Sequence, residues 1–314
     1  RVLWCGIRAL QQRYEFVECV VYTGDTEATS EDIVKRAKER FNIELKKPVQ
    51  FIYLSKRRWV EAGQWPHFTL LGQSIGSIFL GFEAIFKFLP DVYIDTMGYS
   101  FTYPLFRFLG GCSVGCYVHY PTISTDMLSK VRSREHSYNN LGAISNSAVL
   151  TYLKLAYYKI FALLYCVVGK CASVIMVNST WTQNHIIQIW NKPSATSVVY
   201  PPCNTTEFSK LGNCSEISSI KKILSIGQFR PEKNHALQIK SFARFLKKKK
   251  SSTRHKFVLS LVGSCRNKED SDRVDDLMLL CEELCVLDNV EFHLNIPYAE
   301  LKEQLSQSTI GIHT

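Results

Sequence analysis

Residues 225–234 read Ser-Ile-Gly-Gln-Phe-Arg-Pro-Glu-Lys-Asn, and they join a β-branched run to a helical pattern. A strand that runs into a glycine, a basic loop and then a helix is typical of a parallel α/β sheet. Gly227 lets the backbone approach a ligand closely, Arg230 can bind two phosphate oxygens, and Lys233 adds charge near a helix N-terminus. The stretch therefore predicts a loop that holds a diphosphate.

Two widespread phosphate motifs are absent from this loop. The sequence has neither Gly-x-x-x-x-Gly-Lys-Ser/Thr nor Gly-x-Gly-x-x-Gly at this position. Because arginine and lysine are normally exposed, a basic surface loop after a strand explains the residues equally well. Both interpretations stay open from the motif alone.

The alternation of strand and helix patterns continues along the whole chain, which favours parallel α/β sheets. Strands are predicted at 19–23, 49–54, 92–95, 114–119, 174–178, 197–200, 223–227, 257–263, 290–294 and 309–313. Helices are predicted at 31–41, 70–88, 150–168, 182–190, 235–248, 271–284 and 298–306. Two prolines at 201–202 precede a polar segment, so we expect a first domain at 1–202, a linker at 203–219 and a second domain at 220–314.

The composition is that of a globular protein with a basic surface. The chain has 314 residues, 46% of them hydrophobic, which suffices for about two domains with their own cores. Its net charge of +10 favours an anionic partner, and nucleic acid, a phospholipid surface and a diphosphate all qualify. The 11 cysteines are odd in number and often lie in apolar runs, which indicates reduced thiols in a reducing compartment.

No segment is predicted to span a membrane. Two apolar, uncharged runs have 15 residues (68–82) and 10 residues (160–169), whereas a bilayer requires about 20. Residues 150–168 are apolar with interspersed tyrosines and lysines, which fits either a membrane interface or a helix buried against a sheet. The chain starts without Met and stops inside a strand-like run, so we expect a fragment cut at both ends.

Two patterns suggest metal ligands but are better explained otherwise. Cys112/Cys116 and Cys281/Cys285 have zinc-compatible spacing without a further pair of ligands nearby. Asp270-Ser271-Asp272 looks like a metal-binding Asp-x-Asp pair, but it lies in a charged run at a helix start, where acidic residues favour the helix dipole. We therefore predict no metal site.

Three further side chains are candidates because of their position relative to predicted strands. His119 and Asp95 end their strands, and the carboxyl ends of parallel strands border the ligand crevice of such sheets. His119 is a core histidine in the alternative interpretation. Asp126 lies in the Thr/Ser-rich segment after the strand that ends at His119. Both Asp126 and Asp95 either contact hydroxyl groups of a ligand or cap a helix.

Longer stretches connect the basic loop to a known family. The run from Gly227 through Arg230 to Asn234 resembles the donor-phosphate motif of glycosyltransferase family four, which has the GT-B fold. The stretches that extend the resemblance are 66–74 (PHFTLLGQS), 91–95 (DVYID) and 117–128 (YVHYPTISTDML). The resemblance covers essentially the whole chain, and it is closest to α-1,2-mannosyltransferases that elongate dolichol-linked oligosaccharides. It implies two Rossmann-like domains that face each other across a cleft, the second one truncated.

The resemblance also implies roles for single residues. Those implied for the donor, GDP-mannose, are Gly227, Arg230, Lys233, Asn234, Gly263 and Ser264. The catalytic residues implied are His119, which contacts the transferred sugar, and Arg230 and Lys233, which stabilise the leaving group. The residues predicted for the acceptor, from their position beside the strand ends, are Asp95, Tyr120 and Asp126. No cofactor or metal is implied besides the donor substrate.

The implied activity is the retaining transfer of mannose from GDP-mannose to a dolichol-diphosphate oligosaccharide during N-glycan precursor assembly. The implied surroundings are the cytosolic face of the endoplasmic reticulum membrane, with other mannosyltransferases of the pathway as partners and no nucleic acid. The family's glycine-rich N-terminal loop and paired-glutamate motif are not found in the chain, so we expect the fragment itself to be inactive. Two alternatives stay open: a transferase that uses a UDP-sugar and a soluble acceptor, and a non-catalytic scaffold for other transferases.

Overall fold

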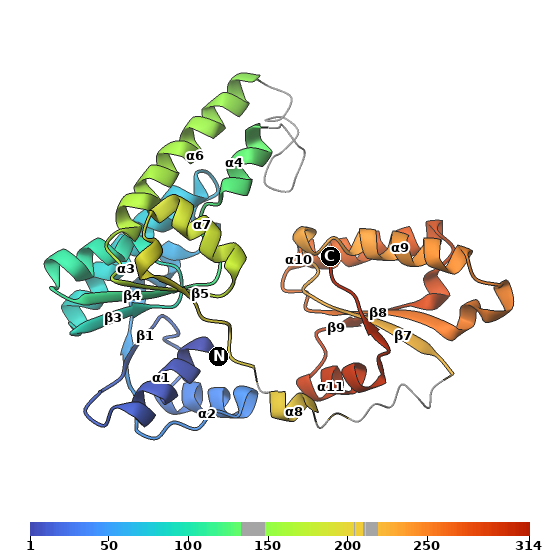
Figure 1. Ribbon diagram of the computed structural model, residues 1–314, viewed down its shortest axis with the longest axis horizontal. Helices are drawn as coiled ribbons and strands as arrows, with labels where there is room; N and C mark the ends of the chain where they lie inside the picture. Colours follow the sequence, from blue (N-terminus) through green and yellow to red (C-terminus); the bar gives the residue numbers. More distant parts are fainter. Residues whose placement is uncertain (133–147, 204, 210, 212–218) are drawn as a thin grey trace. The chain divides into compact units, whose positions relative to one another are not determined.

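A computed structural model describes residues 1–132, 148–203, 205–209, 211 and 219–314 (Figure 1). The chain divides into two compact units, Arg1–Pro202 and Cys203–Thr314. Most of the predicted linker, 203–219, lies outside the described residues, and its described part contains the short helix α8 (Thr205–Ser209).

The first unit is built on parallel strands, as the alternating pattern indicates. A four-stranded sheet has the order β3-β4-β5-β6, with strands Val92–Asp95, Ser113–Val118, Val174–Val177 and Thr196–Val198. The strands β1 (Val20–Thr23) and β2 (Gln50–Tyr53) form a separate parallel pair. In the central strand β4 only Ser113 is exposed, which explains its nearly continuous apolar sequence.

Six helices are described in the first unit, and α4 among them packs against α6. They are α1 (Val2–Arg13), α2 (Ser30–Phe41), α3 (Thr69–Lys87), α4 (Thr125–Arg132), α6 (Ala148–Gly169) and α7 (Thr180–Trp190). The sequence patterns predicted neither α1 nor α4. The helix α1 lacks a side-chain cap at Arg1, and α4 begins in the Thr/Ser-rich segment that contains Asp126.

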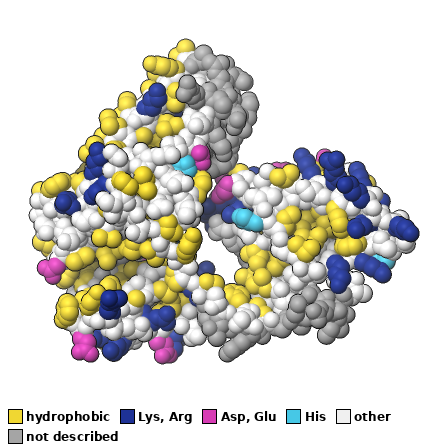
Figure 2. Space-filling view, in the orientation of Figure 1, with side chains coloured by type: hydrophobic (Ala, Val, Ile, Leu, Met, Phe, Trp, Pro, Cys, Tyr) yellow, Lys and Arg dark blue, Asp and Glu magenta, His cyan; other side chains and the backbone are white. Residues whose placement is uncertain are grey.

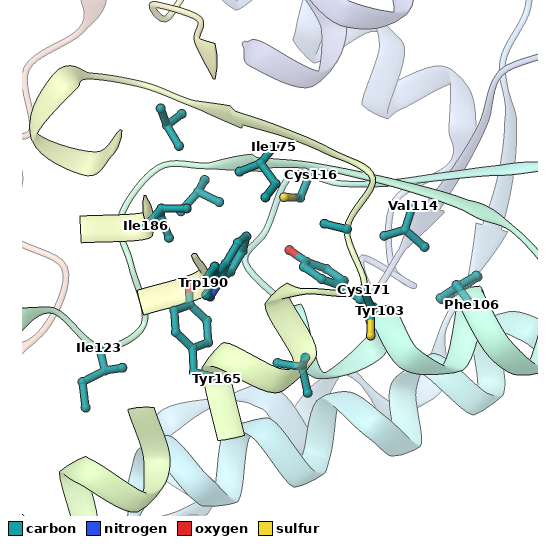
Figure 3. Packing of buried hydrophobic residues seen from close by; sticks show 14 of the residues in the cluster. Tyr103, Phe106, Val114, Cys116, Ile123, Tyr165, Cys171, Ile175, Ile186 and Trp190 are labelled. Carbon is teal, nitrogen blue, oxygen red and sulfur yellow. The ribbon is translucent and has the colours of Figure 1, made fainter. Parts of the chain in front are cut away.

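Aromatic rings pack among aliphatic and cysteine side chains in the core of the first unit (Figure 3). Trp190 is fully buried, and its ring meets Tyr165 at 5.1 Å and Tyr103 at 6.2 Å, both edge to face. A side chain at Gly169 would collide with the indole ring, so the end of α6 can approach Trp190 only with glycine there. These contacts fix α6 and α7 relative to the sheet.

The helix α3 is also built into the first unit. Added side-chain atoms at Gly72 and Gly76 would overlap Trp65 and the carbonyl of Trp59, so the helix packs tightly on the segment before it. Glu83 accepts hydrogen bonds from the backbone of Ser55 at 2.8 Å and of Lys56 at 2.9 Å. The helix therefore has a polar anchor within the fold as well as a packed face.

The second unit is a single four-stranded parallel sheet in the order β10-β7-β8-β9. Its strands are β7 (Lys221–Ile226), β8 (Phe257–Gly263), β9 (Val290–Leu294) and β10 (Ile310–Gly311). Its helices are α9 (His235–Lys247), α10 (Lys268–Glu283) and α11 (Tyr298–Gln307). The chain moves from β7 outward to β9 and then returns to the other side of β7. The strand order therefore reverses between β7 and β10, which is the place where such sheets bind ligands.

Short helical turns complete the fold. The 3₁₀ helices are η1 (Ser55–Val60), η2 (Ala62–Gln64), η3 (Ser100–Thr102), η5 (Pro193–Ala195), η7 (Pro231–Lys233), η8 (Ser251–Lys256) and η9 (Leu287–Asn289), and η4 (Leu105–Leu109) is a π-helix. Most predicted strands and helices occur with ends displaced by a few residues. The largest difference among strands is β10, which has two residues where 309–313 was predicted.

Candidate diphosphate and sugar sites

The basic loop after β7 lies at the reversal of strand order in the second unit. The segments that follow β7 and β10 meet there, because the Thr314 hydroxyl donates to the carbonyl of Lys233 at 2.7 Å. Gln238, in the first turns of α9, donates to the same hydroxyl at 2.9 Å. Gly227, Arg230 and Lys233 are thus at the carboxyl end of the sheet, where the sequence pattern placed a ligand loop.

Two glycines bring the loops after β7 and β8 together. The amide of Gly227 donates to the carbonyl of Val262 at 2.9 Å. A side chain at Gly263 would overlap the carbonyl oxygen of Gly227, whereas one at Gly227 would make an ordinary contact at 3.6 Å with Lys233. Within the chain, the steric need for glycine is therefore at Gly263, while the close approach of a ligand to Gly227 stays a prediction. Ser264 adds a further contact between the two loops, because its carbonyl accepts a hydrogen bond from the Phe229 amide at 3.4 Å.

The two predicted cations differ in their surroundings. The guanidinium of Arg230 lies 3.4 Å from the Glu232 carboxylate, and its Nε atom is buried without a partner in the described residues. Lys233 extends beside Gly227 and forms no salt bridge within the described part of the chain. Arg230 is thus weakly paired on a partly exposed surface, while Lys233 is available to an anion.

Asn234 has a structural task in this loop. It adopts the left-handed conformation, with φ 42°, that asparagine tolerates better than most residues. Its side-chain oxygen accepts from the amide of Leu237 at 3.4 Å and so caps α9. The side-chain oxygen of Asn234 is therefore used by the helix, and the backbone of the α9 N-terminus can face an anion.

His235 is a residue of this site that the sequence analysis missed. It is 3% exposed, stacks on Phe229 at 4.8 Å, and has an unpartnered Nδ1 atom in the described residues. Burial, reinforced by the nearby cations Lys233 and Arg273, lowers the pKa of His235 to about 4. The ring is therefore neutral at pH 7. Its place directly after Lys233-Asn234, at a helix start, was the signal available in the sequence.

The Asp270-Ser271-Asp272 segment serves the start of α10. Asp270 is buried and accepts from the backbone and guanidinium of Arg266 at 3.1 and 3.2 Å. Although burial acts in the opposite direction, these hydrogen bonds lower the pKa of Asp270 below its usual value. Among the described residues, no group of three or more His, Cys, Asp or Glu side chains could hold a metal ion.

In the first unit, His119 and Tyr120 directly follow β4 and are exposed. The His119 ring lies 4.9 Å from Tyr117, edge to face, and Tyr117 is itself fixed by donation to the Val199 carbonyl at 2.7 Å. His119 is therefore not a core histidine. Its imidazole is accessible at the carboxyl end of the central strand.

The structure gives Asp95 a different role from the predicted acceptor contact. Its carboxylate is 4% exposed and accepts from the amides of Met97 and Gly98 at 2.8 and 3.1 Å. The Tyr103 hydroxyl donates to it at 2.7 Å. Burial raises the pKa of Asp95 despite these hydrogen bonds. Asp95 thus stabilises the loop after β3 from within the first unit, and it is not free for a sugar.

Asp126 lies in the first turn of α4 and contacts His185, which the sequence analysis missed together with Trp181. Its Oδ2 atom is 3.4 Å from Nε2 of the buried His185. The other ring nitrogen, Nδ1, is 2.8 Å from the Thr125 hydroxyl. Trp181 packs against the His185 ring at 4.2 Å and against Tyr120 at 5.2 Å. The spacing of Trp181 and His185 on one helix face was the signal that the sequence offered.

Comparisons with family models divide the chain in the same region as the fold does. A model described as ALG11 mannosyltransferase N-terminus matches residues 1–190. A second, described as Glycosyl transferases group 1, matches residues 216–314.

Relatives of known name match along the whole chain. A Xenopus laevis protein named GDP-Man:Man(3)GlcNAc(2)-PP-Dol alpha-1,2-mannosyltransferase is 55% identical over 315 residues. The Homo sapiens protein of the same name is 52% identical over 315 residues. Both alignments cover 100% of this chain and 64% of the relative, so the chain spans 64% of the length of these relatives.

Solved structures show the fold at lower identity. The Anabaena protein HepE in complex with UDP and glucose has a TM-score of 0.55 at 16% identity, covering 99% of this chain and 69% of that one. The apo structure of OtsA has a TM-score of 0.61 at 12% identity, covering 94% and 77% respectively. The prediction of an α/β GT-B fold is thereby confirmed.

Proposed function

This chain belongs to the ALG11 mannosyltransferase family, and from this premise we propose that it transfers mannose from GDP-mannose to Man(3)GlcNAc(2)-PP-Dol through an α-1,2 linkage. The observation that carries the proposal is the loop 227–234, which offers two cations at the strand-order reversal between β7 and β10. A nucleoside diphosphate is the kind of ligand that such a crevice and such charges bind.

The proposed chemistry depends on stabilising the departing diphosphate. As the bond from the mannose C1 to the GDP oxygen breaks, negative charge grows on the phosphate beside Arg230 and Lys233. Fixed donors of this kind contribute about 3–4 kcal/mol each to transition-state stabilisation. The acceptor 2-hydroxyl attacks on the face from which GDP leaves and passes its proton to the departing diphosphate, so the configuration is retained. The cations supply the positive charge, and the mechanism uses no metal.

The structure supports a division of labour among the candidate residues. On the donor side, Arg230 and Lys233 bind phosphate oxygens, Asn234 contributes through the helix N-terminus that it caps, and the backbone around Gly227, Gly263 and Ser264 lies under the nucleotide. On the acceptor side, we assign His119 to the transferred mannose, because it is exposed at the end of β4. Tyr120 and Asp126, on the same segment, are assigned to the acceptor sugars.

The acceptor carries a dolichol chain, so we propose that the first unit rests on the cytosolic face of the endoplasmic reticulum membrane. Two helices, α3 and the 149–169 part of α6, are long and apolar enough to cross a membrane, because each continues past the charges that limit its uncharged run. Of the α6 window only 22% is buried, against 44% for α3. Because core helices can have the same length and composition, the low burial of α6 makes its surface the candidate for membrane contact.

The exposed side of α6 has the pattern of an interfacial helix. Ile160, Leu163 and Val167 are exposed at helical spacing, and Figure 2 shows apolar side chains along this helix. Exposed lysines, Lys159 and Lys170, lie on the same side. Exposed apolar patches with basic edges mark surfaces that meet anionic lipid, and the opposite side of α6 packs into the core.

The test is a transfer assay on the full-length protein with a dolichol-linked trimannosyl acceptor. Radiolabelled GDP-mannose is expected to label the acceptor, and an α-1,2-specific mannosidase should release the label. Transfer from UDP-glucose in place of GDP-mannose would show that a different donor is used. If neither donor labels the acceptor, the result would favour the alternative of a non-catalytic scaffold for other transferases.

A further inference from the structure

Two exposed aromatic side chains lie side by side at the carboxyl end of the first unit's sheet. Tyr120 is 59% exposed and Trp181 is 41% exposed, with ring centroids 5.2 Å apart and planes inclined by 31°. They come from the loop after β4 and the first turn of α7. We call this pair the aromatic shelf. Large exposed aromatics that share one surface indicate a binding site for a partner with an apolar face.

The backbone beneath the aromatic shelf is held firmly. On the Tyr120 side, Ile123 and Ser124 are fully buried, and the Thr122 amide donates to the Tyr165 hydroxyl at 3.4 Å. On the Trp181 side, Ser179 caps α7 by accepting from the amide of Thr182 at 3.2 Å. The two exposed rings are therefore presented by a rigid support, so a ligand does not have to order them first.

A buried histidine connects the aromatic shelf to α4. The His185 ring meets Trp181 at 4.2 Å with an angle of 67°. Its two nitrogens lie 2.8 Å from the Thr125 hydroxyl and 3.4 Å from the Asp126 carboxylate. The ring is thus held on both sides by residues of α4 while it supports the indole from below. Asp126 also keeps part of its carboxylate in solvent.

We propose that the aromatic shelf binds the terminal mannose of the acceptor oligosaccharide; this proposal rests on the transferase function proposed above. A pyranose ring has a face of C–H groups, which packs on the negative face of an aromatic ring. Its hydroxyl groups need acceptors, which the solvent-exposed oxygen atoms of Asp126 provide. His119 immediately precedes Tyr120. A sugar on the aromatic shelf therefore lies next to the position assigned to the transferred mannose.

The surroundings favour a sugar over a lipid tail as the occupant. An acyl or isoprenoid chain requires an apolar groove, whereas polar residues accompany the aromatic shelf: the exposed His119 precedes Tyr120, and Asp126 contacts the His185 ring on which Trp181 packs. The exposed apolar side chains that suit a lipid surface lie on α6, outside the aromatic shelf.

The proposal is tested by steady-state kinetics of the detergent-solubilised full-length protein. Trp181→Ala is expected to raise the KM for the acceptor by up to about tenfold, which corresponds to about 1.4 kcal/mol for the lost ring contact. The KM for GDP-mannose should not change. Trp181→Phe should restore most of the acceptor affinity. Phe86→Ala, which removes an exposed aromatic of α3 in the same unit, is the matched control and should leave both constants unchanged.

Several outcomes overturn the proposal. One is an unchanged acceptor KM in Trp181→Ala, and another is an equal rise of both KM values, which indicates a general structural defect. A third is an effect that appears with a dolichol-linked acceptor but disappears with a short-chain lipid carrying the same glycan, which would place the lipid on the aromatic shelf. An equal fold-change with both lipids supports the sugar.

A binding measurement separates the aromatic shelf from the transferase function. Titration of the free trimannosyl glycan, followed by the indole N–H signal of Trp181 in NMR spectra, needs no turnover. If the protein binds the glycan through Trp181 but does not transfer mannose, the result would contradict the proposed function and support glycan binding by the aromatic shelf. A protein that transfers mannose while this signal stays unperturbed would contradict the aromatic shelf alone.

Discussion

The two units carry loops at the carboxyl end of similar parallel sheets, yet the chemistry of these loops differs. In the second unit, the loop 227–234 offers Arg230 and Lys233 above a close backbone contact made by Gly263. In the first unit, the loops after β4 and β5 offer Tyr120, Trp181 and part of the Asp126 carboxylate. One set of residues suits a diphosphate and the other suits a neutral sugar.

The same contrast extends to the outer helices. The exposed side of α10 in the second unit is mostly charged, whereas α6 in the first unit exposes an apolar stripe. Charged helices suit contact with water, and apolar stripes suit contact with lipid. The comparison teaches that one sheet architecture is specialised by its edge loops and by the outer faces of its helices. The donor chemistry is assigned to one unit, and the acceptor and membrane chemistry to the other.

The largest effect is expected from removing the cations of the second unit. Arg230→Ala or Lys233→Ala should lower kcat by about 10²–10³-fold, because charge on the departing diphosphate loses a fixed partner. Mannose transfer from saturating GDP-mannose measures the change. Lys247→Ala, at the far end of α9, removes an exposed cation of the same unit and should leave kcat unchanged. A fall of similar size in Lys247→Ala would mean that net charge, and not the loop, matters.

The next effect concerns the glycine contact below that loop. Gly263→Ala should destabilise the second unit by about 1–3 kcal/mol, since the new methyl group overlaps the Gly227 carbonyl and the two strands must separate. Gly227→Ala adds a methyl group at ordinary contact distance and is the matched control. Thermal unfolding followed by circular dichroism compares the two variants. Equal midpoints would show that the strand contact can relax without cost.

A pH effect is expected from His235. The unfolded chain binds a proton at this histidine below about pH 6.5, whereas the folded unit resists protonation until about pH 4. The stability of the second unit should therefore fall between pH 6.5 and 4, by about 3 kcal/mol from this group. Hydrogen exchange of the β7 and β8 amides measures this fall. His235→Phe should reduce the slope, and an unchanged slope would contradict the assignment.

The smallest effect is expected at the membrane surface of the first unit. Leu163→Glu should weaken binding to anionic phospholipid vesicles by about tenfold, because a carboxylate must then approach the lipid. Leu163 is 64% exposed, so the fold itself should tolerate the change. Leu279→Glu in α10 alters a leucine of similar exposure, 57%, in the second unit. In a flotation assay with vesicles, Leu163→Glu should bind more weakly than Leu279→Glu. Equal vesicle binding by both variants would contradict the proposal that α6 contacts the membrane.

Strand positions could be predicted where an apolar run has clear polar boundaries. The strands β8 and β9 begin and end where the sequence placed them, at 257–263 and 290–294. The helix α1 could not be predicted as easily, because its N-terminal residue provides no side-chain cap and few of its residues are buried. The spacing of apolar residues therefore reveals that a helix or strand exists more readily than it reveals where a helix without a capping side chain begins.

Side-chain roles were harder to predict than strand ends. His119 and Asp95 both end predicted strands, but only His119 is exposed, while Asp95 turns inward to Tyr103. The position of a strand end gives the edge of the sheet and does not give the direction of the side chain. The contact of His185 with Thr125 joins residues 60 positions apart, and no local pattern reveals it. By contrast, the loop 227–234 could be located from sequence because its residues are contiguous.

The central claim is that Arg230 and Lys233 hold a diphosphate, and calorimetric titration with GDP tests it most directly. GDP should bind the wild-type full-length protein and should bind Arg230→Ala and Lys233→Ala at least about tenfold more weakly, which corresponds to about 1.4 kcal/mol for each lost contact. Lys247→Ala should bind GDP like the wild type. Equal GDP affinity in all four proteins would contradict the account.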